Sequence, residues 1–117
     1  MGFLHNDIKL DNVLIGNDDA ETIYLIDFGL ATPWQDEKAQ THVPHQFLGV
    51  FSGNFIYSSM NACKGFANAR KHDIESIFYV IAYLLNQEYI PWLEYCKDDI
   101  LERLDKKKKS GTLKQFI

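Results

Sequence analysis

Two short apolar runs separated by a turn-rich stretch constrain this chain most strongly. Residues 12–16 (Asn-Val-Leu-Ile-Gly) form the first run, and residues 22–26 (Thr-Ile-Tyr-Leu-Ile) form the second. Residues 17–21 between them (Asn-Asp-Asp-Ala-Glu) are rich in side chains that favour turns. Two short runs joined by a brief polar loop predict an antiparallel β-hairpin.

The register of this hairpin decides which polar side chains meet at its open end. If Ile15 faces Tyr24, Asn12 at the start of the first strand comes to lie near Asp27 after the second. An amide oxygen and a carboxylate then converge on one spot. The pattern therefore predicts a polar site at the base of the hairpin.

The strongest helical signal covers residues about 73–85, which are apolar on nearly all sides. A helix that is apolar all round is usually buried, so we expect this one to be the central helix. Asp73 is expected to cap its first turn and Asn86 to end it.

A second, amphipathic helix is expected from about residue 92 to about residue 107. Residues 28–61 show no periodicity and contain several Gly and Pro residues, so they predict a long loop. The expected fold class is α+β and mainly helical, with a short β-hairpin and two main helices. The second helix is indicated by apolar residues at helical spacing: Leu93, Cys96, Ile100 and Leu104.

Composition sets the remaining limits. A chain of 117 residues with a net charge of −4 fits one small domain and has no overall attraction to nucleic acid or to an anionic membrane. The longest apolar run, residues 77–85, is about half of what a bilayer span needs. Cys63 and Cys96 form no CxxC motif, and no secretory signal opens the chain. We therefore expect an intracellular protein, cytoplasmic or nuclear, without a membrane span.

Two motifs flank the predicted hairpin at fixed spacing. Residues 5–12 read His-Asn-Asp-Ile-Lys-Leu-Asp-Asn, and residues 27–29 read Asp-Phe-Gly. Together they resemble the catalytic-loop and metal-binding signatures of protein kinases. The resemblance implies a partial protein-kinase C-terminal lobe over residues 1–117, with an activation segment at 27–61. The Gly-rich loop and the β3 lysine of the family would precede Met1.

The resemblance also implies roles for four side chains. Asp7 would orient the substrate hydroxyl and accept its proton, and Lys9 would neutralise the γ-phosphate. Asn12 and Asp27 would hold Mg²⁺, which prefers oxygen ligands, and would thereby bind the cofactor ATP. The implied partners are proteins that present Ser or Thr hydroxyls, and no nucleic acid or membrane partner is expected.

Later segments resemble the casein kinase I family in particular. Residues 59–61 (Ser-Met-Asn) stand where that family has Ser-Ile-Asn, residues 73–76 read Asp-Ile-Glu-Ser, and residues 90–92 read Ile-Pro-Trp. The implied activity is a serine/threonine kinase of casein kinase I type. In that family the counterpart of Asp73 anchors the catalytic loop through backbone N–H groups.

Three positions depart from the family pattern. Asn6 replaces an arginine that often pairs with an activation-loop phosphate, so activation by loop phosphorylation is not expected. Asn54 replaces a threonine that bridges the catalytic Asp and Lys, which implies a weaker alignment of Asp7. Ile56 replaces an arginine that favours acidic substrates.

Other readings of the sequence remain open. The chain is either an enzyme or a non-catalytic, truncated or pseudo-kinase piece that acts by binding. Singly, Asp7, Asn12 and Asp27 are also ordinary cap and turn residues. His42 and His45 form an H-x-x-H pair, but a zinc site needs further ligands nearby. Residues 106–109 are four lysines, which fit a solvated helix end better than a phosphate-binding site or a nuclear signal.

Overall fold

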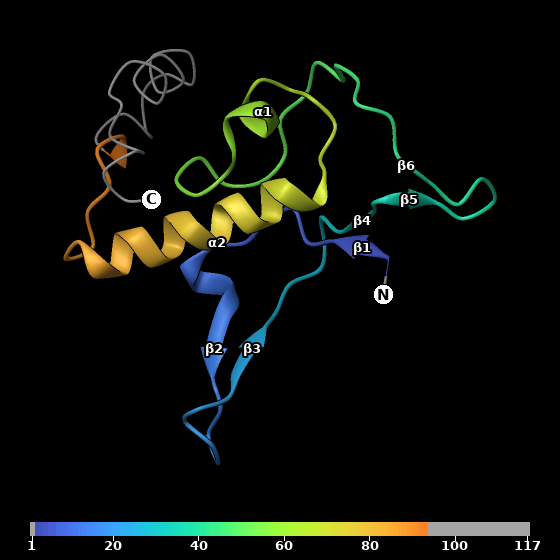
Figure 1. The fold of residues 1–117 in the computed structure, drawn as a ribbon. Helices are drawn as coiled ribbons and strands as arrows, with labels where there is room; N and C mark the ends of the chain where they lie inside the picture. Colours follow the sequence, from blue (N-terminus) through green and yellow to red (C-terminus); the bar gives the residue numbers. More distant parts are fainter. Residues whose placement is uncertain (1, 94–117) are drawn as a thin grey trace.

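The structure is a computed structural model in which residues 2–93 are described (Figure 1). The strands within it form three separate antiparallel pairs, β1–β4, β2–β3 and β5–β6. The elements follow one another as β1 (Phe3–Leu4), η1 (Leu10–Asn12), β2 (Val13–Ile15), β3 (Ile23–Leu25), β4 (Thr32–Pro33), β5 (Gln35–Asp36), β6 (Thr41–His42), α1 (Met60–Cys63) and α2 (Arg70–Leu85).

The fold is α+β, and the expectation that it is mainly helical is wrong. Within the described residues the two helices, one of them only 4 residues long, stand beside three strand pairs. β4, β5 and β6 all lie in the stretch predicted to be a loop. Each of these strands has two residues, which is too short for the alternation that reveals a strand in sequence. The predicted helix at about 92–107 falls outside the described residues, except for Trp92 and Leu93.

The predicted hairpin is present as β2 and β3, and Figure 1 shows it projecting from one side of α2. Its register differs by one residue from the expected one, because Ile15 pairs with Ile23 rather than with Tyr24. The backbone N–H of Ile26 consequently donates to the carbonyl of Asn12 at 2.9 Å. Asp27 lies one residue beyond this last pair.

α2 is the long helix of the described chain, with 16 residues. It begins at Arg70, with Ala69 as its N-cap, so Asp73 lies in the first turn and is not the cap that the sequence predicted. The helix ends at Leu85, and Asn86 is its C-cap as predicted. No helix in the described part of the chain is long and apolar enough to cross a membrane.

In the described part of the chain, only one side of α2 is buried. The prediction that this helix is buried on nearly all sides is therefore wrong. Tyr79 and Val80 are buried, together with the polar side chains of His72 and Ser76. An apolar face on the other side is exposed to solvent. This face includes Ile74, Ile77, Phe78, Ile81, Leu84 and Leu85.

The hydrophobic core forms where the covered side of α2 meets the loop after β1 and the turn that follows α2. The Trp92 ring packs edge-on against Tyr79, with 5.1 Å between ring centroids, and its indole N–H donates to the carbonyl of Ile56 at 2.7 Å. Apolar packing of this kind fixes the positions of the loops that border it. The buried members of the core are Ile8, Tyr57, Tyr79, Val80, Ile90 and Trp92.

Candidate active site

The loop that carries the first motif is tied to α2 by one carboxylate. Asp73 accepts the backbone N–H of His5 at 2.7 Å and that of Asn6 at 3.0 Å. Hydrogen bonds to an ionised carboxylate are about twice as strong as neutral ones, so two of them hold this loop firmly. The anchoring role that the resemblance implied for Asp73 is confirmed.

His5 joins the same loop to the end of the hairpin. Its side chain is buried, and its Nε2–H donates to the carbonyl of Ile26 at 2.9 Å. Its Nδ1 accepts the backbone N–H of Asp7 at 3.2 Å. The Phe28 ring meets the imidazole edge-on at 4.9 Å. Both ring nitrogens are therefore engaged, which gives His5 a structural role.

Three side chains converge on the carboxylate of Asp7, whose side chain is 10% exposed. The Lys9 ammonium lies 3.4 Å from Oδ2, and the Asn12 amide donates to the same oxygen at 3.3 Å. The Asn54 amide donates to Oδ1 at 3.2 Å. Partners on both oxygens fix the plane of the carboxylate, which is the preorganisation that a positioned proton acceptor needs.

Asn54 is a residue whose contribution the sequence underestimated. Its Nδ2 also donates to the carbonyl of Ile8 at 3.2 Å, and its Oδ1 accepts the backbone N–H of Tyr57 at 2.7 Å. An amide has both donors and acceptors, so one side chain can bridge the Asp7 carboxylate and two backbone segments. Asn54 therefore connects the first motif to the segment that leads into α1.

Asn12 and Asp27, the two expected metal ligands, lie in different environments. Asn12 is buried, and its Nδ2 donates to the Asp7 carbonyl at 2.9 Å. Its Oδ1 has no hydrogen bond among the described residues. Asp27 is exposed and has a left-handed backbone with a φ of 60°. Its Oδ1 accepts the backbone N–H of Gly29 at 3.2 Å.

These oxygens are the kind of ligand that Mg²⁺ prefers, so the donor set of Asn12 and Asp27 fits the metal that protein kinases use. In residues 2–93 no three His, Cys, Asp or Glu side chains gather into a metal-binding cluster. His42 and His45 line the same cavity, but this part of the chain supplies no third ligand of those types for zinc.

Asn6 is the residue whose role the sequence missed. Its φ is 68°, a left-handed conformation that Asn tolerates better than most residues. Its Nδ2 donates to the carbonyl of Leu30 and to Oγ1 of Thr32, both at 2.8 Å, and its Oδ1 accepts from Asn68 at 2.9 Å. Asn6 thus fastens the segment after the second motif directly to the loop.

Comparison with protein-family models identifies a family for most of the chain. The model described as "Fungal protein kinase" matches residues 1–85 of the 117, a stretch that contains both motifs, the hairpin and all of α2. The geometry is consistent with the match, since the loop of the first motif is anchored on α2 by Asp73 and its His5 contacts Phe28 of the second motif. The chain belongs to the fungal protein kinase family.

Proposed function

We propose that the chain is part of a serine/threonine protein kinase of casein kinase I type, which transfers the γ-phosphoryl group of ATP to protein hydroxyls. The observation that carries the proposal is the Asp7 carboxylate, which is held by Lys9, Asn12 and Asn54 from two separate segments. A carboxylate fixed on both oxygens beside a lysine is suited to phosphoryl transfer, where catalysis consists mainly of positioning and of charge stabilisation.

Asp7 acts on the hydroxyl of the substrate side chain. It orients the hydroxyl and accepts its proton as the oxygen forms a bond to the γ-phosphorus. The bond between that phosphorus and the bridging oxygen of the nucleotide breaks, and the electron pair leaves with ADP. The products are a phosphorylated side chain, ADP and the proton first taken up by Asp7.

Lys9, Asn12 and Asp27 manage the charge on the phosphates. Lys9 neutralises negative charge that builds up beside Asp7. The Oδ1 of Asn12 and the carboxylate of Asp27 would hold Mg²⁺, which supplies charge neutralisation at the phosphate oxygens when it is bound. Asn12 also stiffens the site, since its amide donates both to the backbone and to the carboxylate of Asp7.

Three segments support casein kinase I type among protein kinases. They are residues 59–61, 73–76 and 90–92, which follow the pattern of that family. Each has a structural part in this chain: Ser59 caps α1, Asp73 anchors the catalytic loop, and Trp92 is in the core. Ile56 stands where the family has an arginine, so we propose a reduced preference for acidic substrates.

The direct test is a transfer assay with a kinase N-terminal lobe fused ahead of Met1. Radiolabelled γ-phosphate should move from ATP to peptides that contain Ser or Thr, and not to matched peptides in which Tyr replaces them. Label on Tyr peptides alone would contradict the proposed specificity. No label on any peptide would contradict the proposed activity.

The competing function is binding without transfer. It is favoured by the exposure of Asp27. It is also favoured by Asn6 and Asn54, which stand where the resemblance implies an arginine and a threonine. Nucleotide-dependent thermal shift separates the two functions in the same fusion. Stabilisation by ATP with Mg²⁺ together with transfer supports the enzyme, whereas a folded fusion that is neither stabilised nor active supports the binding module.

A further inference from the structure

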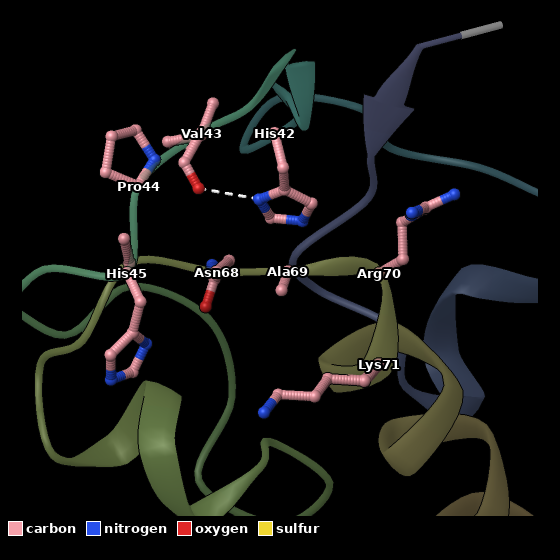
Figure 2. Close-up of a pocket in the computed structure, with 9 residues that line it drawn as sticks. His42, Val43, Pro44, His45, Asn68, Ala69, Arg70 and Lys71 are labelled. Carbon is pink, nitrogen blue, oxygen red and sulfur yellow. Dashed lines mark hydrogen bonds between the residues drawn. The ribbon is translucent and has the colours of Figure 1, made fainter.

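A cleft lies between residues 42–45 and the start of α2, away from the Asp7 cluster. It has a volume of about 460 Å³, and its lining includes His42, His45, Arg70 and Lys71 (Figure 2). No Asp or Glu of the described chain lines it. A cavity of this size bordered by two cations and two imidazoles, without a carboxylate, has the electrostatics of an anion site.

Arg70 is held in place by an aromatic ring. Its guanidinium lies 4.0 Å from the centre of the Trp34 ring, and the Trp34 ring lies 5.8 Å from that of His42. Stacking of this kind leaves the N–H groups of a guanidinium free to donate to an anion. Within residues 2–93 neither Arg70 nor Lys71 forms an ion pair, so both charges are available.

The backbone at this end of α2 adds further donors. The N-cap, Ala69, has no side-chain acceptor, and the described residues give the backbone N–H groups of Arg70 and Lys71 no acceptor. The only carboxylates in the first two turns of α2 are engaged elsewhere, since Asp73 binds the catalytic loop and Glu75 accepts the Tyr79 hydroxyl. The positive end of the helix therefore adds to the two side-chain charges.

Acidic residues of the described chain line a neighbouring cavity and not this cleft. Asp36 and Glu37 line a neighbouring cavity, which shares His42 and Pro44 with this one. The segment that bears His42 thus separates an acidic cavity from a basic one. Figure 2 shows that Arg70 and Lys71 extend in different directions from the first turn of α2, which spreads the positive charge along the cleft.

We infer that this cleft binds a phosphate monoester dianion. A phosphate dianion carries more negative charge and more acceptor oxygens than a carboxylate. It can therefore pair with both cations and accept from the free N–H groups at the same time. The cavity is larger than a phosphate group, so it accommodates the side chain that carries it. Two sources share this chemistry, a phosphorylated side chain of a peptide and free inorganic phosphate. The inference is independent of phosphoryl transfer, since it concerns binding away from Asp7.

The test is titration of the isotopically labelled 117-residue chain, without nucleotide, followed by NMR. The probes are a phosphoserine peptide, the same peptide with serine, and inorganic phosphate. The chain has two tryptophans, so the indole N–H of Trp34 reports on the cleft while that of Trp92 in the core serves as the internal reference. We expect saturable shifts at Trp34 and Lys71, and a Kd for the phosphopeptide about tenfold below that for the serine peptide.

Variants make the result specific to the cleft. Lys71→Gln should weaken phosphopeptide binding about tenfold, and Arg70→Lys should weaken it through loss of the fork geometry. Lys38→Gln, at an exposed lysine that does not line the cleft, should change nothing. Equal affinity for phosphopeptide and inorganic phosphate would assign the site to the free anion. The inference is overturned if no phosphate probe shifts Trp34, or if Lys38→Gln weakens binding as much as Lys71→Gln.

Discussion

The side-chain amide of Asn54 donates to the carboxylate of Asp7 at 3.2 Å, across 47 positions of sequence. The same amide group holds the backbone at Ile8 and Tyr57. One residue in the segment before α1 therefore sets the orientation of the proposed proton acceptor. The amide donates two hydrogen bonds and accepts one, whereas a hydroxyl can donate only one.

Removal of this amide should lower activity through misalignment of Asp7. Asn54→Ala is expected to reduce kcat in the fused transfer assay by about tenfold or more, because a small displacement of a catalytic group slows reaction strongly. Asn54→Thr should recover most of that loss, since a hydroxyl can still donate to the carboxylate. Asn17→Ala, in the exposed hairpin turn, is the matched control. An Asn54→Ala variant with unchanged kcat would show that Asp7 is oriented without it.

The carboxylate of Asp73 should contribute substantially to stability. Asp73→Ala removes the acceptor for the backbone N–H groups of His5 and Asn6, and is expected to lower the free energy of unfolding by about 3 kcal/mol. Urea unfolding of the 117-residue chain measures the difference. Asp18→Ala, in the exposed turn of the hairpin, should stay within about 0.5 kcal/mol of the parent. Equal effects of the two variants would contradict the anchoring role.

Asn6 should keep the start of the activation segment ordered without a phosphate. Asn6→Gly retains a residue that accepts the left-handed φ of 68° but removes the bonds to Leu30 and Thr32. Hydrogen exchange should then quicken by about tenfold at the backbone N–H groups of Ala31 and Trp34, which are bonded in the parent.

The N–H of Gly16 in the hairpin provides the internal control for this experiment, since its bond to Thr22 does not involve Asn6. Unchanged exchange at Ala31 and Trp34 would mean that the β1–β4 pair alone orders the segment. Quickened exchange at all three positions would indicate general loosening of the fold.

The pattern of residues made some of this architecture predictable. Polar turn formers between two apolar runs were enough to predict the β2–β3 hairpin. Its register was not determined, because Ile23, Tyr24 and Leu25 are consecutive apolar residues and a shift of one leaves the pattern almost unchanged. The pairing of Ile15 was therefore wrong by one position.

Contacts in the site between residues close in sequence could be predicted, and contacts between distant residues could not. Asp7, Lys9 and Asn12 lie within six positions, so the spacing of a single motif brings them together. The contacts of Asn54 and Asp73 with this loop span 47 and 68 positions, and only the tertiary fold establishes them. The exposure of one face of α2 could not be predicted either. Sequence periodicity shows which side chains of a helix are apolar, but it does not show what packs against them.

The chain should lose stability in mild acid because of His72. Burial, and next the charge of Lys71, lower the pKa of this imidazole from its ordinary value of 6.5. Its Nδ1 accepts the backbone N–H of Ala69, and its Nε2 has no partner among the described residues, so the neutral ring is the form that fits. The unfolded chain binds a proton first, and stability therefore falls as the pH drops below about 6.5.

His72→Gln isolates this effect. A glutamine at this third helical position can accept the same Ala69 N–H but does not titrate. Urea unfolding at about pH 7.5 and about pH 5.5 should show a smaller loss of stability in the variant than in the parent. Identical losses would mean that other groups account for the acid sensitivity.

The central claim is that Asp7 is the proton acceptor for phosphoryl transfer, and single-turnover kinetics in the fused chain test it most directly. Asp7→Asn keeps the size of the side chain but removes its basicity and replaces one of its two acceptor oxygens by an NH2 donor, so the rate should fall by about 100-fold or more. Asp11→Asn, at an exposed carboxylate four positions away, should leave the rate unchanged. Rates that match for the two variants would contradict the account.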